Sequence, residues 1–75
     1  MQAPADPVDQ IIADLTPAQR RVVKAGRIPY GRWSLWFALN EKHLFVSADR
    51  TPALTELGRE CQRRLVTSEL AGAAA

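Results

Sequence analysis

The chain has 75 residues, of which 47% are hydrophobic and 24% charged, and its formal net charge is +2. This length allows one domain, and the composition is that of a globular chain rather than a disordered one. A single cysteine, Cys61, and a single histidine, His43, exclude an intrachain disulfide and form no recognisable zinc site.

Both ends of the chain are expected to lie outside the folded domain. Residues 1–7 are rich in alanine and proline and predict a flexible arm, and residues 71–75 predict a frayed tail. A single domain over residues 8–70 remains. The first residues lack the basic start and apolar run of a signal peptide, and no apolar stretch is long enough to cross a bilayer. We therefore expect a cytoplasmic protein with no membrane contact.

Two helices are predicted at the start of this domain. The first apolar residues of the domain have the spacing i, i+3, i+4, i+7 of an amphipathic helix: Val8, Ile11, Ile12 and Leu15. The next residues, Thr16-Pro17-Ala18-Gln19, have the order of a capping box with proline at the first helical position. Gly26 is placed to end this second helix as a left-handed C-cap.

A connector and an aromatic segment follow. Residues 27–31 contain Pro29 and Gly31, which both resist helix. Residues 32–39 are apolar nearly all round, and their periodicity leaves helix and strand both open. We favour a helix that ends near Lys42, because its second half consists of good helix formers. A domain this small cannot easily bury all its aromatic rings, so some should face a partner, with Trp36 the leading candidate because it lies off the main apolar face.

A hairpin and a final helix complete the predicted elements. Residues 44–46 are an apolar run and residues 47–52 a polar turn with Arg50 near its tip, so we expect strands near residues 44–46 and 53–55. Thr55 is the expected N-cap of the last helix. On that helix Gly58 permits close backbone approach, and Cys61 is expected to be a small buried hydrophobe.

Several of these motifs have a familiar order. Leu44-Phe45-Val46, the turn, and Leu54-Thr55-Glu56-Leu57-Gly58 with Leu65 resemble the wing and last helix of winged-helix regulators of the MarR-like and PadR-like groups. Residues 35–46 resemble the recognition helix running into the wing, and residues 15–19 resemble the start of an earlier helix. His43 stands where those families usually have a turn glycine.

The resemblance covers residues 15–65 and implies a mainly α domain with a small β-hairpin. The domain is winged-helix-like but reduced, because residues 26–32 leave no room for a further helix. The resemblance also implies DNA as the ligand, since the second helix of a helix-turn-helix enters the major groove.

Charge distribution is consistent with a DNA ligand. Residues 15–40 contain five basic residues and no acidic one, which suggests a patch for phosphates or for an acidic protein surface. Phosphate contacts are predicted for Arg20, Arg21, Lys24 and Arg27. Base contacts are predicted for Arg32, Asn40 and Lys42, and Arg50 on the turn is expected to reach the neighbouring groove.

No catalytic constellation is present in the sequence, so we expect a non-enzymatic binding module without cofactor, metal or small-molecule substrate. A DNA-binding regulator of transcription is the first hypothesis. The alternative is a protein–protein interaction module, such as a phage-type inhibitor or adaptor of a host protein, anchored by Tyr30, Trp33, Trp36 and Phe37. RNA stacking on these aromatic rings is a third option, and a homodimer through them is compatible with either of the first two.

Overall fold

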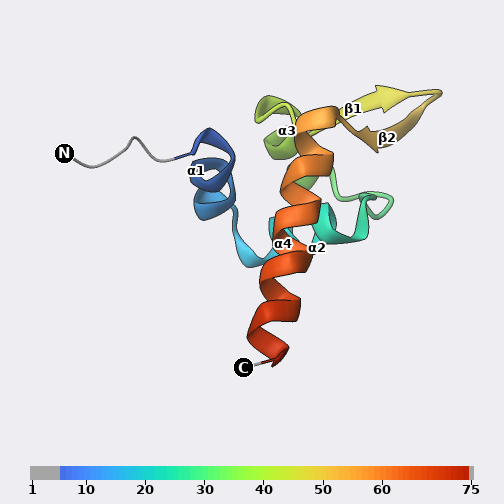
Figure 1. Ribbon diagram of the computed structural model, residues 1–75. Coiled ribbons are helices and arrows are strands. Elements are labelled where there is room, and N and C mark those ends of the chain that lie inside the picture. Colours follow the sequence, from blue (N-terminus) through green and yellow to red (C-terminus); the bar gives the residue numbers. More distant parts are fainter. Residues whose placement is uncertain (1–5, 75) are drawn as a thin grey trace.

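The computed structural model describes residues 6–74 and contains four helices and one hairpin within them. The elements in chain order are α1 (Pro7–Asp14), α2 (Pro17–Ala25), α3 (Trp33–Glu41), β1 (Phe45–Ala48), β2 (Thr51–Leu54) and α4 (Glu56–Ala74). Figure 1 shows the hairpin and the connector between α2 and α3 on the same side of the molecule, away from α1. The predicted mainly α fold with a small β-hairpin is confirmed.

The first two helices begin with side-chain caps. The Asp6 carboxylate accepts a hydrogen bond from the Val8 N–H at 2.8 Å, and Pro7 is the first helical residue. The predicted arm was therefore wrong at Pro7, while its residues 1–5 lie outside the described part of the chain. The predicted capping box of α2 is present, because Thr16 Oγ1 accepts from the Gln19 N–H and the Gln19 side chain accepts from the Thr16 N–H.

Periodicity left helix and strand both open for the aromatic segment, and the segment forms a helix, α3, from Trp33 to Glu41. The helix ends in a Schellman motif. His43 has the left-handed φ of 62°, its N–H donates to the Asn40 carbonyl at 3.0 Å, and the Leu44 N–H donates to the Leu39 carbonyl at 3.0 Å. His43 thus adopts the left-handed backbone conformation that glycine adopts with the least steric cost.

The hairpin pairs β1 with β2 in antiparallel register, from Phe45 opposite Leu54 to Ala48 opposite Thr51. Its two turn residues, Asp49 and Arg50, both have positive φ, as a two-residue type I′ turn requires. The predicted strands included Leu44 and Thr55, but both residues lie outside the observed strands. Leu44 closes α3, and Thr55 caps α4 by accepting from the Gly58 N–H at 3.0 Å.

Seven residues form the buried core: Leu15, Val22, Val23, Leu39, Leu44, Phe45 and Cys61. Helix α4 packs against α1 and α2 and brings Gly58 against the backbone of Leu44. The buried position expected for Cys61 is confirmed, and this burial raises the pKa of its thiol.

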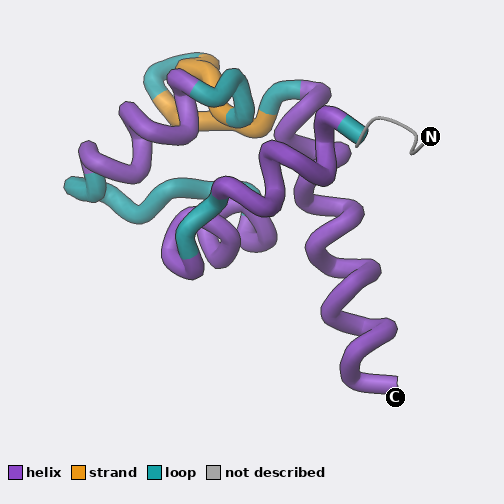
Figure 2. The backbone as a smooth tube through the Cα atoms, turned by 90° about the vertical axis from the view of Figure 1, so that its left-hand side faces the viewer, coloured by secondary structure: helices purple, strands orange, loops and turns teal. Residues whose placement is uncertain are grey.

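The second half of α4 extends past the other elements, as Figures 1 and 2 show. The helix continues to Ala74, so a frayed tail was the wrong prediction for residues 71–74. Alanine, which is frequent there, has the highest intrinsic helix propensity. Among residues 6–74, no helix combines the length and apolar character needed to cross a membrane.

Candidate nucleic-acid interface

A tight turn at the end of the connector places Tyr30 in solvent. The Arg32 N–H donates to the Pro29 carbonyl at 3.2 Å, and Gly31 has a φ of 83°. A positive φ at the third position is the requirement of a type II turn, and glycine meets it without steric cost. The side chain of Tyr30 is consequently 99% exposed, and Arg32 follows it at the N-terminus of α3.

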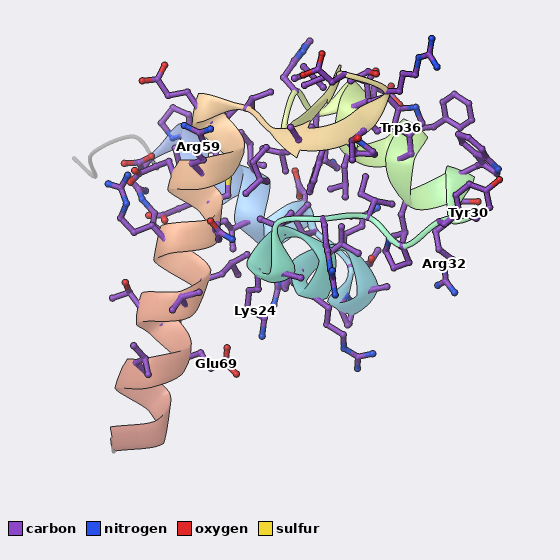
Figure 3. The ribbon with its side chains drawn as sticks, turned by 90° about the vertical axis from the view of Figure 1, so that its right-hand side faces the viewer. Lys24, Tyr30, Arg32, Trp36, Arg59 and Glu69 are labelled. Atoms are coloured by element: carbon purple, nitrogen blue, oxygen red, sulfur yellow. The ribbon has the colours of Figure 1, made fainter. Side chains whose placement is uncertain are left out.

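An open groove of about 370 Å³ lies between this turn and the hairpin. One wall contains Tyr30, Arg32 and Trp33, and the other wall contains Arg50 and Pro52 of the hairpin. Trp36 lines the groove and also packs against the core. Figure 3 shows Tyr30 and Arg32 directed outward at the start of α3. We call this feature the aromatic groove; it has aromatic rings on one side and an arginine on each side.

A second surface hollow, next to the aromatic groove, is also lined by arginines. It is lined by Arg21, Arg27 and Pro29, together with apolar atoms of α2. Pro29 also lines the aromatic groove, so the two hollows adjoin one another. We define the arginine edge as the four exposed arginines that line these two hollows: Arg21, Arg27, Arg32 and Arg50.

The arginine edge differs in its pairing from Arg63 and Arg64 of α4. On α4, Arg64 contacts Asp6, Asp9 and Glu60 at 3.0–3.2 Å. Arg63 likewise contacts Glu60 at 3.0 Å. None of the four arginines of the edge makes an ion pair with a carboxylate of residues 6–70. Positive charge on this side is therefore available to an external anion.

Two of the predicted phosphate ligands have partners within the protein. Arg20 donates to the Ile12 carbonyl at 3.2 Å, and its Nε is buried without a hydrogen-bond partner among the described residues. Lys24 forms an ion pair with Glu69 at 3.0 Å, and Figure 3 shows both residues on the lower part of the molecule. The other two predicted phosphate ligands, Arg21 and Arg27, belong to the arginine edge.

Of the residues predicted to contact bases or the neighbouring groove, two belong to the arginine edge and two do not. The Asn40 amide donates to the Phe45 carbonyl at 3.0 Å, where it joins the end of α3 to β1. Lys42 is half-buried at the C-cap of α3. Arg32 and Arg50, in contrast, are exposed and line the aromatic groove from its two sides. The structure thus brings together half of the eight predicted residues and assigns the others to places outside this surface.

The aromatic residues of α3 are exposed to different degrees, and Trp33 and Phe37 are more exposed than Trp36. Trp33 is 61% exposed and Phe37 65% exposed, one turn apart on the outer face of α3. Trp36 is partly buried against the core, so it is not the freely exposed ring that was expected, and its role as an anchor stays a prediction. Hairpin residues line the same groove as Trp36, and this long-range arrangement cannot be read from the periodicity of the helix.

Sequence reasoning did not identify the hairpin residues that form the second wall of the groove: Ser47, Thr51 and Pro52. The polar turn between two apolar runs indicated the hairpin but not what the hairpin faces. No protein-family model, characterised protein or solved structure matches this chain.

Proposed function

We propose that this protein is a non-catalytic DNA-binding module with a reduced winged-helix arrangement, acting as a cytoplasmic regulator of transcription. In this proposal α2, the connector and α3 form the helical part, and the β1–β2 hairpin is the wing. The order of elements and the position of the hairpin directly after α3 support this assignment.

The arginine edge is the observation on which the DNA proposal depends. Its four guanidinium groups are exposed and have no ion-pair partner among residues 6–70. Guanidinium groups bind phosphate oxygens in bidentate geometry, and phosphate contacts supply most of the affinity for DNA. Arg50 sits at the tip of the wing, where it can reach a phosphate or groove beside the one that α3 contacts.

Helix α3 offers few groups that could read base edges. Its outer face presents Trp33 and Phe37, and the amide of Asn40 is bound to the Phe45 carbonyl. Base-edge recognition requires donors and acceptors at defined positions, as Asn, Gln and Arg provide. We therefore propose that binding is mainly to the phosphate backbone and varies little with duplex sequence.

The test is a titration of fluorescently labelled mixed-sequence duplex DNA at two salt concentrations. Four phosphate contacts correspond to a slope of about −3.6 in log K against log [salt], which is roughly a 100-fold loss between 50 and 200 mM. Absence of binding at 50 mM salt would contradict the proposal.

A protein partner is the second candidate, and one observation favours it. Trp33, Phe37 and Tyr30 expose most of their aromatic surface, and Trp and Tyr are enriched at the energetic centres of protein interfaces. Phe37 distinguishes the two candidates because it lies outside the residues that line the aromatic groove. Its replacement by alanine should abolish capture of a protein partner but leave DNA affinity unchanged.

A further inference from the structure

The aromatic groove combines two features that recognise different parts of a nucleotide. Tyr30 and Trp33 offer exposed ring faces, while Arg32 and Arg50 approach from the two walls as unpaired cations. The volume of about 370 Å³ lies in the range, roughly 300–1,000 Å³, in which proteins hold small organic groups. An anionic ligand with a flat aromatic part is complementary to this surface in both shape and charge.

Bases within a duplex cannot use these rings. Their faces are stacked on neighbouring bases, and only their edges are accessible from the grooves. Tyrosine and tryptophan rings, by contrast, bind unpaired bases by stacking, which is worth about 1–3 kcal/mol per base and tolerates any sequence. The groove therefore matches an unpaired nucleotide better than a paired one.

The start of α3 adds to the positive character of the groove. The N-cap residue Arg32 makes no side-chain hydrogen bond to the first turn, so the N–H groups of that turn lack a capping side chain. The N-terminus of a helix carries a partial positive charge and commonly binds phosphate. Both Arg32 and Trp33, the first helical residue, line the groove.

We propose that the aromatic groove binds one unpaired nucleotide of DNA, with its base stacked on Tyr30 and Trp33 and its phosphate held by Arg32 and Arg50. This inference rests on the proposed DNA-binding function and makes DNA with a locally unpaired segment the preferred ligand. The arginine edge holds the adjoining backbone on either side.

The experiment compares two DNA ligands of equal charge: a 20-base-pair duplex and the same duplex with four central mismatched pairs. Equal phosphate number removes the electrostatic difference between them, so any preference reports on contacts to unpaired bases. Because stacking of one base is worth about 1–3 kcal/mol, the wild type should bind the mismatched DNA about 10-fold more tightly, and its tryptophan fluorescence should be quenched on binding.

Tyr30→Ala is the informative variant, because a side chain that is 99% exposed makes no contribution to the core. We expect it to lose affinity for the mismatched DNA by roughly 5- to 10-fold, at most the whole preference of the wild type, and to keep the duplex affinity of the wild type, since one stack is worth about 1 kcal/mol or more. Phe37→Ala is the matched control, an exposed aromatic residue outside the groove, and should change neither affinity.

Equal binding of both DNAs by the wild type, with no effect of Tyr30→Ala, would overturn the groove inference while leaving the DNA-binding function intact. Failure to bind either DNA would overturn both. Binding of poly-glutamate that depends on Tyr30, with no binding of either DNA, would overturn the inference in favour of an acidic protein partner.

Discussion

The N–H of Leu44 donates to the carbonyl oxygen of Leu39 at 3.0 Å, and the side chains of both residues are fully buried. This contact closes α3 and sets the direction in which β1 leaves it. The wall that the hairpin contributes to the aromatic groove therefore depends on His43, the left-handed residue between α3 and Leu44.

Replacing His43 by glycine should stabilise the protein. A non-glycine residue in the left-handed region costs about 1–2 kcal/mol, whereas the extra backbone entropy of glycine costs about 0.5–1 kcal/mol. We expect a net gain of about 0.5–1 kcal/mol in the free energy of unfolding, measured by urea denaturation. His43→Val, which places a β-branched residue at the same φ, should lose stability, and equal stability of the two variants would contradict this interpretation.

Gly58→Ala should destabilise the protein, although alanine is the better helix former by about 1 kcal/mol. An added Cβ would overlap the Leu44 carbonyl oxygen and lie 2.9 Å from a methyl group of Leu54. Overpacking against a fixed backbone costs about 1–3 kcal/mol or more, so we expect a net loss of about 2 kcal/mol in urea denaturation. Gly31→Ala meets no atom within 4 Å and should lose only about 1 kcal/mol, from its positive φ. A Gly58→Ala protein more stable than the wild type would rule out this close approach.

The Asp6 carboxylate should stabilise the fold in a pH-dependent way. Its pKa is below its ordinary value, mainly because it accepts a hydrogen bond from the Val8 N–H and, in addition, because it contacts Arg64. A lowered folded-state pKa gives a contribution that is present above the unfolded pKa, about 4, and is lost as the pH falls through the folded one.

Asp6→Asn isolates this effect, because asparagine keeps the capping oxygen and removes only the charge. We expect its deficit in unfolding free energy to be constant from pH 7 to 5 and to shrink below pH 4. A deficit that stays constant down to pH 2.5 would show that the ionised carboxylate contributes nothing through its pKa.

The two tryptophans should differ in accessibility to a soluble quencher. In Trp36→Phe the remaining Trp33, 61% exposed, should be quenched strongly by acrylamide; in Trp33→Phe the remaining Trp36 should be protected. Trp36→Ala should lose about 2 kcal/mol of stability, less than the 3–5 kcal/mol typical of a fully buried ring, and Trp33→Ala less than about 1 kcal/mol. The opposite order of quenching would show that α3 is rotated about its axis.

The features predicted from sequence are those determined by neighbouring residues. The Thr16 capping box, the Gly26 C-cap and the Thr55 N-cap each depend on residues within one helical turn, so local chemistry was sufficient to predict them. The roles of Lys24 and Trp36 were not predictable, because Lys24 pairs with a residue 45 positions away and Trp36 packs against the core. Long-range packing therefore decides which basic and aromatic residues stay available to a partner.

The most direct test of the DNA-binding proposal is the salt dependence of duplex binding by two double variants of equal net charge. Arg32→Gln/Arg50→Gln removes two residues of the arginine edge, and Arg59→Gln/Arg63→Gln removes two exposed arginines of α4. Figure 3 places Arg59 at the opposite side of the view from Arg32. Each lost phosphate contact reduces the log–log salt slope by about 0.9, so we expect the first variant to lose about 1.8 from the slope and the second to match the wild type. Equal slopes for the two variants would contradict the assignment of DNA binding to the arginine edge.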